Sequence, residues 1–170
     1  MMLKEYVRDI QDFPKKGILF KDITPLLASP EATNVCLQKL TEKLKNVKID
    51  KVVGVESRGF FFGTLLAHEL QAGFVPVRKA GKLPFTTVSA SYELEYGTDT
   101  LEIHADAIQK GDKVLVHDDV LATGGTIKAV CELVEALGGE IVQVSFLMEL
   151  LFLNGGDKIK AYDRFAVMEY

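Results

Sequence analysis

The chain has 170 residues, of which 48% are hydrophobic and 26% are charged, and its formal net charge at pH 7 is -4. This length and composition predict a single globular domain over residues 1–170 that buries a core without disulfides or structural metals. The acidic balance argues against a protein whose main partner is nucleic acid, because binding a phosphate chain requires a basic surface.

The N-terminal stretch "MMLKEYVRDIQDF" mixes acids and bases and lacks the apolar core of a signal peptide. Leu3, Tyr6, Val7 and Ile10 fall on one helical face, which predicts a short amphipathic helix that "FPKKG" ends. Ser29 and Pro30 resemble an N-cap and a first helical residue, and a second helix is expected from there to about Asn46. Residues 1–50 are therefore interpreted as a largely helical region.

Beyond Lys51, four short runs are apolar and rich in β-branched residues: "KVVGVE", "GFVPV", "DKVLVH" and "EIVQVSFLM". Continuous hydrophobicity of this kind is typical of strands buried on both faces of a parallel sheet. Residues 58–71 and 124–137 have helical periodicity; their expected buried faces are Phe62, Leu65, Leu66 and Leu70, and Ile127, Val130, Cys131, Val134 and Leu137. Strands alternating with helices predict an α/β domain with a mainly parallel central sheet flanked by helices.

Residues 78–100 fit this alternation poorly, because a basic cluster is followed by small hydroxyl residues and then by tyrosines and acids. A loop or β-ribbon of this length is usually functional, and we expect a mobile lid. Cys36 and Cys131 lack partners at metal-binding spacing and are expected to be buried thiols in a reducing cytosol. The longest strongly apolar run, about 59–67, is roughly half of a bilayer span, so we expect a cytoplasmic protein without a membrane partner.

The stretch "VLVHDDVLATGGTIKAV" carries the chemistry. Asp118 and Asp119 follow a buried strand, and residues 122–126 lead into a helix, whose N-terminal amides and dipole favour an anion such as phosphate. Adjacent carboxylates repel phosphate but suit the hydroxyls of a ribose or a magnesium ion carried by a phosphorylated ligand. The pattern predicts a site for a ribose 5-phosphate; the alternative is a solvated turn before a glycine-rich helix start. Neither G-x-G-x-x-G after a strand nor G-x-x-x-x-G-K-[ST] is present.

"VLVHDDVLATGGT" resembles the phosphoribosyl-pyrophosphate (PRPP) signature of the type I phosphoribosyltransferases. "FPKKGILFKDITPLL", "GVESRGFFFG", "VPVRKAGKLP" and "SYELEYGTDTLEIH" resemble further blocks of the members of that family that act on adenine, in the same order. The resemblance implies transfer of the phosphoribosyl group of PRPP to N9 of adenine, which releases AMP and pyrophosphate. It also implies the type I fold with a catalytic loop, a magnesium ion carried mainly by PRPP, no direct protein ligands to the metal, and a homodimer.

The same resemblance implies the site residues. Catalytic roles fall on Glu95, Tyr96, Asp118 and Asp119. The 5-phosphate is assigned to Ala122, Thr123, Gly124, Gly125 and Thr126. Pyrophosphate is assigned to Glu56, Ser57, Arg58, Arg78, Lys79 and Lys82, with a cis peptide expected before Ser57. Adenine is assigned to Leu19, Phe20 and Lys21.

Each assignment has a structural alternative. Arg58 also reads as a surface arginine at a helix start, Phe20 as a core residue, and Glu95 with Tyr96 as part of an exposed ribbon. His117 stands where the family usually has an aliphatic residue and is interpreted as a satisfied sheet residue.

Two other functions compete with adenine salvage. A phosphoribosyltransferase for another base would share the PRPP signature, although "ELEYG" and "ILFKDITPLL" favour adenine. A non-catalytic PRPP-sensing regulator would need a DNA-binding module, which the pattern does not contain. Lys21, where the family commonly has arginine, and the distinctive C-terminal segment are the other departures.

Overall fold

The computed structural model describes residues 1–93 and 97–170. The chain forms two compact units, Met1–Lys39 and Leu40–Tyr170; the expectation of one domain over 1–170 stays a prediction. In the described residues no helix is long and apolar enough to cross a bilayer. The elements of the first unit are η1 (Leu3–Tyr6), β1 (Arg8–Gln11), β2 (Leu19–Asp22), α1 (Thr24–Leu27) and most of α2 (Pro30–Thr41).

The helix predicted at the N-terminus is wrong beyond Tyr6. Only a single 3-10 turn forms, and β1 then pairs antiparallel with β2, with Ile10 opposite Phe20. The loop between the strands contains a cis Phe13-Pro14 bond and is closed by Asp12, whose Oδ1 accepts a hydrogen bond of 2.7 Å from the Gly17 amide. Eight residues cannot distinguish the two periodicities reliably, and here the pairing with a strand further along the chain decided the outcome.

The second predicted helix is confirmed as α2. Ser29 Oγ accepts a hydrogen bond of 3.2 Å from the Ala32 amide, as an N-cap should. The regular helix ends at Thr41 and continues as a 3-10 turn, η2 (Glu42–Leu44), so the predicted end at about Asn46 was a few residues late.

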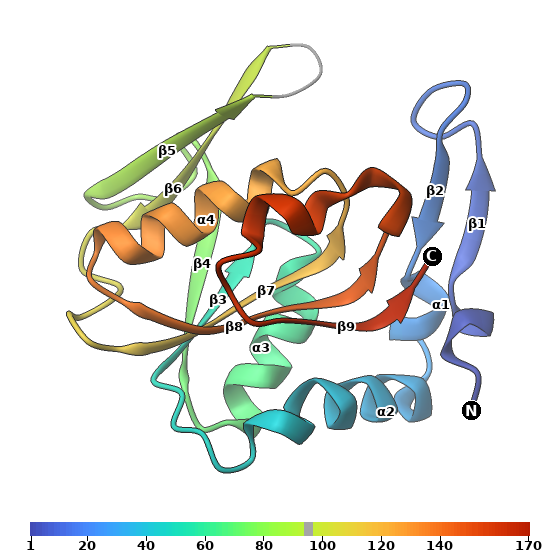
Figure 1. The fold of residues 1–170 in the computed structure, drawn as a ribbon, viewed down its shortest axis with the longest axis horizontal. Coiled ribbons are helices and arrows are strands. Elements are labelled where there is room, and N and C mark those ends of the chain that lie inside the picture. Colours follow the sequence, from blue (N-terminus) through green and yellow to red (C-terminus); the bar gives the residue numbers. More distant parts are fainter. Residues whose placement is uncertain (94–96) are drawn as a thin grey trace. The chain divides into compact units, whose positions relative to one another are not determined.

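The second unit is an α/β layer structure (Figure 1). Its strands are β3 (Lys51–Val55), β4 (Gly73–Lys79), β5 (Thr87–Glu93), β6 (Thr98–His104), β7 (Lys113–Leu121), β8 (Glu140–Glu149) and β9 (Arg164–Glu169). Its other elements, besides the end of α2 and η2, are α3 (Gly59–Glu69), α4 (Gly125–Ala136), η3 (Leu151–Leu153) and η4 (Gly155–Ile159).

These strands form one sheet in the order β5-β6-β4-β3-β7-β8-β9. The strands β4, β3, β7, β8 and β9 are mutually parallel, whereas β5 and β6 form an antiparallel hairpin beside β4. The four predicted strands and the mainly parallel sheet are therefore confirmed. For residues 78–100 the sequence left a loop or a β-ribbon open; β5 and β6 form a ribbon that extends to His104, and the mobile lid stays a prediction. The strand β9 was not predicted.

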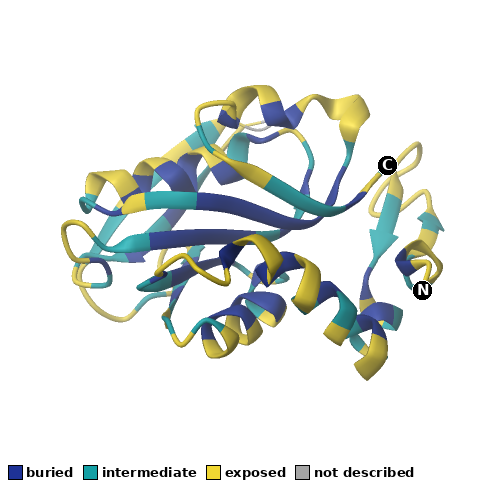
Figure 2. Ribbon diagram, turned by 60° about the horizontal axis from the view of Figure 1, so that its bottom comes forward, coloured by how far each residue is buried: buried dark blue, intermediate teal, exposed yellow. Residues whose placement is uncertain are grey.

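Helices α3 and α4 lie on opposite faces of the sheet (Figure 1), and buried residues, dark blue in Figure 2, are concentrated in the central strands and on one side of each helix. Strand β7 is central: Val114, Leu115 and Val116 are fully buried. On α3, Phe62 and Leu66 are buried as expected, but Leu65 is 36% exposed because α3 turns that side away from the sheet.

Candidate active site

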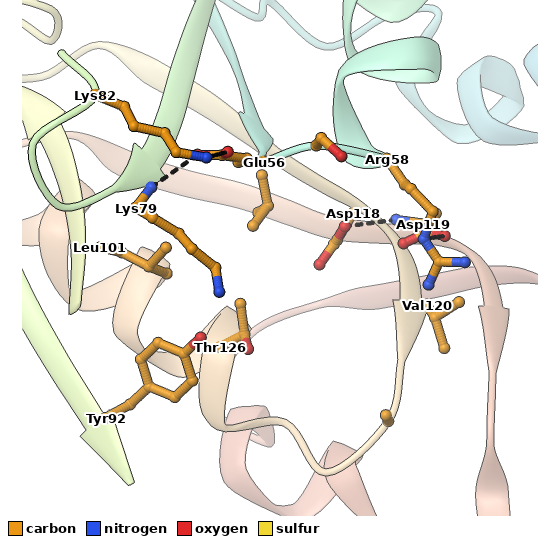
Figure 3. Close-up of a pocket in the computed structure, with 13 residues that line it drawn as sticks. Glu56, Arg58, Lys79, Lys82, Tyr92, Leu101, Asp118, Asp119, Val120 and Thr126 are labelled. Atoms are coloured by element: carbon orange, nitrogen blue, oxygen red, sulfur yellow. Dashed lines mark hydrogen bonds and ion pairs between the residues drawn. The ribbon is translucent and has the colours of Figure 1, made fainter. Parts of the chain in front are cut away.

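Three connections meet at the carboxyl edge of the parallel strands and surround a cavity of about 610 Å³ (Figure 3). The first leads from β3 to α3, the second leaves the end of β4 toward β5, and the third leads from β7 to α4. Parallel strands bring their ends to one edge, which is where open α/β sheets bind ligands. Predicted site residues that line the cavity are Glu56, Ser57, Arg58, Lys79, Lys82, Asp118, Asp119, Ala122 and Thr126.

The loop between β7 and α4 has the geometry of an anion site. Gly124 precedes the first residue of α4 in the left-handed conformation, with φ of 79°, which glycine adopts without strain. A small adjoining hollow of about 70 Å³ is lined by residues that include Thr123, Gly124 and Thr126. Gly125 begins the helix and faces a neighbouring hollow beside Tyr92. Backbone amides and hydroxyls thus gather where the α4 dipole is positive.

The carboxylate pair lies on β7 beside this loop. β7 runs on to Leu121, so the acids lie within the strand rather than after it, and Asp118 pairs with Phe146 of β8. Asp118 is partly exposed to the cavity, whereas Asp119 is only 4% exposed. Both residues nevertheless line the cavity, and the Asp119 amide donates a hydrogen bond of 2.8 Å to Asp118 Oδ1, so the two carboxyl groups lie close together.

Arg58 is the counter-charge of this pair. Its Nε lies 2.9 Å from Asp119 Oδ2, which receives no aligned hydrogen bond from the described residues. Burial raises the pKa of Asp118 well above its usual value, and the Asp119 charge adds to this. Burial also raises the pKa of Asp119, against the opposing effect of Arg58. A hydrogen-bond donor that approaches a carboxyl group with a raised pKa stabilises its charged form and lowers that pKa.

Glu56 gathers the cations of the opposite wall. Its carboxylate contacts Lys82 Nζ, accepts a 2.8 Å hydrogen bond from the Lys79 amide, and lies 3.4 Å from Arg78 Nε. Burial acts to raise the pKa of Glu56, but these donors together hold it below its usual value. The peptide between Glu56 and Ser57 is cis, as the family resemblance implied.

The Lys79 side chain extends across the cavity instead of joining Glu56 (Figure 3). Its Nζ lies 2.9 Å from Asp99 Oδ2, and this hydrogen bond raises the pKa of Lys79. The Tyr92 hydroxyl donates to the same carboxylate over 3.4 Å. Tyr92, Leu101 and Val120 also line the cavity and were not predicted. In the sequence of β5, Val88, Ala90 and Tyr92 alternate with polar residues, and this alternation could have pointed to Tyr92; Leu101 and Val120 carry no polar signal.

His117 is fully buried in β7, and its Nδ1 lies 2.9 Å from Ser145 Oγ. Nε2 has no hydrogen-bond partner among the described residues. Burial lowers the pKa of His117 to about 3, so the imidazole is neutral at physiological pH. His117 was expected to be a sheet residue with its hydrogen bonds satisfied, but only one of its two ring nitrogens has a partner among the described residues.

The roles predicted for two further groups of residues stay predictions. Leu19, Phe20 and Lys21 form most of β2 in the unit Met1–Lys39, where Phe20 packs edge-on against Phe13 at 5.0 Å between ring centroids. Lys21 Nζ lies 2.7 Å from Asp9 Oδ1. Glu95 and Tyr96 lie outside the described residues.

Comparisons with known proteins agree with this geometry. The family described as "Phosphoribosyl transferase domain" matches residues 22–163. The chain is 71% identical to the adenine phosphoribosyltransferase of Flavobacterium johnsoniae over the full length of both. It superposes on the enzyme of the same description from Rhodothermus marinus with a TM-score of 0.95 and 53% identity, covering 99% of this chain and 96% of that one. The adenine phosphoribosyltransferase of Saccharomyces cerevisiae, solved with adenine and an imino-altritol bisphosphate, superposes with a TM-score of 0.92 and 44% sequence identity. The match covers 97% of this chain and 96% of that one.

Proposed function

The chain belongs to the phosphoribosyl transferase domain family and, within it, to the adenine phosphoribosyltransferases, and from this premise we propose how its residues form AMP from adenine and PRPP. One observation supports the proposal: a carboxylate pair and a cation cluster line one cavity, and a phosphate-type loop lies between this cavity and the small hollow that adjoins it. These are the three groups that a ribose carrying a 5-phosphate and a pyrophosphate requires.

The reaction is a substitution at the anomeric carbon of the ribose. The bond between C1 and the pyrophosphate oxygen breaks, its electron pair leaves with pyrophosphate, and N9 of adenine forms the new bond and loses its proton. The transition state has oxocarbenium character, as in glycoside hydrolysis. The protein must hold the ribose, stabilise both developing charges and exclude water.

The 5-phosphate is assigned to Ala122–Thr126. The left-handed Gly124 and the first amides of α4 support this role, because they provide unpaired donors at the positive end of a helix. The hydroxyls of Thr123 and Thr126 add donors in the hollow that the loop surrounds.

Asp118 and Asp119 are assigned to the ribose hydroxyls and to the positive charge that develops on the sugar. Asp119 Oδ2 is buried without an aligned donor among the described residues, so a ribose hydroxyl would satisfy it. Donation to either carboxylate would favour its charged form, which stabilises an oxocarbenium ion.

Pyrophosphate is assigned to the wall formed by Glu56–Arg58, Arg78, Lys79 and Lys82. Glu56 organises this wall, because its carboxylate pairs with both Lys82 and Arg78. When pyrophosphate binds, the ammonium of Lys82 and the guanidinium of Arg58 exchange a carboxylate partner for phosphate oxygens.

The remaining roles rest on the family resemblance. Glu95 and Tyr96 are proposed to take the purine proton and to cover the reacting carbon, and Leu19–Lys21 to bind adenine. PRPP is proposed to enter as its Mg²⁺ complex, since Mg²⁺ favours substrate phosphates and the described residues contain no group of three or more ligand-type side chains for a metal. Residues 78–100 are proposed to act as a lid.

A homodimer is part of the proposal. Large apolar side chains are exposed near the pyrophosphate wall, with Phe61 at 47% on α3 and Phe85 at 63% after β4. A second copy of the chain would cover such surface. Two unpaired cysteines fit a cytosolic location.

The test is incubation with PRPP, magnesium and each of adenine, hypoxanthine, guanine and xanthine. AMP formed only with adenine supports the proposal, and turnover restricted to an oxopurine would overturn it. Chelation of magnesium should abolish turnover, and light scattering of the purified protein should give twice the mass of the 18.8 kDa chain.

A further inference from the structure

The phosphate loop has a second layer behind it, formed by a segment more than 30 residues further along the chain, at the start of η4. A methyl group placed on Gly155 would overlap the carbonyl oxygen of Ala122 and would lie 3.0 Å from the amide nitrogen of Gly124. Conversely, a methyl group on Gly124 would overlap the carbonyl oxygen of Gly155. The two backbones are therefore in direct contact, with no room for a side chain between them.

The conformation on each side of this contact is unusual. Gly124 has φ of 79°, and Asn154, which precedes Gly155, has φ of 52°. Both residues lie in the left-handed region, which L-residues other than asparagine and aspartate rarely occupy. Two tight turns are thus packed against each other, and each limits the movement of the other.

The next residue shows that the contact is specific to Gly155. A methyl group on Gly156 would lie 2.6 Å from Cζ of Arg164, and the three atoms nearest to it all belong to the end of that flexible side chain. η4 also lies along the start of α4, because Lys158 Nζ is 3.9 Å from the position that a methyl group on Gly125 would take. Residues 155–158 of η4 therefore lie beside both the phosphate loop and the first turn of α4.

We propose that Gly155 is a positioning residue for the 5-phosphate of PRPP. By contact with the backbone of Ala122 and Gly124 it holds the loop amides in the orientation that binds phosphate before substrate arrives. Preorganised donors are worth most when they are held within about 0.5 Å of the productive geometry. This inference rests on the proposed function, since it concerns how that same site binds PRPP.

The test compares Gly155→Ala with the matched control Gly156→Ala. Gly155→Ala should raise KM for PRPP, and Kd for PRPP measured by calorimetry without adenine, at least about 10-fold, because small displacements of binding groups have effects of this size or larger. Both variants should keep KM for adenine within about 2-fold, and Gly156→Ala should keep KM for PRPP as well. An unchanged KM for PRPP in a folded Gly155→Ala variant would overturn the inference, as would an equal rise in both KM values.

A second pair of variants decides the matter if Gly155→Ala does not fold. Asn154 is exposed, and Asn154→Gly keeps the left-handed turn whereas Asn154→Val disfavours it. The valine variant should raise KM for PRPP and the glycine variant should not; equal values would overturn the inference. Wild-type protein that forms no AMP would instead refute the proposed function itself.

Discussion

Arg58 and Asp119 join the start of α3 to the carboxyl half of β7 through an ion pair of 2.9 Å between Nε and Oδ2. The Asp119 side chain is 6% exposed and the Arg58 side chain 36%, so one partner is fixed in the sheet and the other reaches the cavity. Breaking such a pair by removing one charge leaves the other poorly compensated. The pair therefore links the side of the cavity that we propose binds ribose to the side that we propose binds pyrophosphate.

Asp119→Asn should lower kcat/KM for PRPP about 100-fold, the usual cost of losing one preorganised electrostatic group. Steady-state kinetics with varied PRPP measure this, and thermal unfolding should show a much smaller effect. Asp106→Asn, at an exposed acid outside the cavity, is the matched control and should behave as wild type. Full activity in Asp119→Asn would remove this carboxylate from the mechanism.

Two glycines of α3 allow a local test of the packing between the helix and Asp118. A methyl group on Gly59 would lie 3.0 Å from Asp118 Oδ1 and 3.0 Å from the His117 carbonyl oxygen, whereas one on Gly63 would lie 2.8 Å from the Phe74 ring. Overpacking costs about 1–3 kcal/mol at either position. Gly59→Ala should lower kcat/KM for PRPP as well as the free energy of unfolding. Gly63→Ala should lower only the free energy of unfolding. Comparable activity in the two variants would contradict this assignment.

Titration of His117 should make the protein less stable in acid. Its folded pKa of about 3 is below the ordinary 6.5, so the unfolded chain binds this proton first. Stability from this group is complete above pH 6.5 and is lost as the pH falls toward 3. When the pH is lowered from 6.5 to 4.5, the free energy of unfolding falls in both proteins, and we expect the fall to be roughly 2–3 kcal/mol smaller in His117→Val than in wild type. Urea unfolding at several pH values measures this, with the exposed His68→Gln as the control; parallel pH profiles of wild type and His117→Val would refute it.

Both cysteines should resist modification in the folded protein. Cys36 and Cys131 are fully buried, and burial raises their pKa values to about 11 and about 12. Because the thiolate is the reactive form, an aromatic disulfide reagent at pH 8 should label neither until the protein opens. Two equivalents should react after urea is added. Rapid labelling of the native protein would show that one of the two sites is accessible.

The parts of the fold that the sequence predicted well depend on local patterns. β3, β4, β7 and β8 are continuous β-branched runs because both of their faces are covered, and α4 shows a clear apolar face. β1 and β9 have only four and six residues. β1 forms because it pairs with β2, and β9 forms because it pairs with β8. The sequence of so short a strand contains little that predicts such pairing.

The site shows the same division. Asp118, Asp119 and the loop that follows were predicted as a site because acids and glycines occur close together after an apolar run, although β7 continues past the acids to Leu121. The contact of Gly155 with Ala122 and Gly124 was not, because it joins two backbones and uses no side chain that a pattern could reveal. Glu56 was expected to meet pyrophosphate, and only the structure shows that it holds Arg78 and Lys82 together.

The distance along the chain between the two layers of the phosphate site affects how the protein is made. Ribosomes add about 5–20 residues per second, so Gly155 is incorporated roughly 2–7 s after Ala122. During that interval the nascent chain contains the loop that we propose binds phosphate, but not the backbone of Gly155 that contacts it. If Gly155 has the proposed role, the capacity to bind PRPP tightly appears only after Gly155 has been added, when the residues of β3 to β8 have already been made.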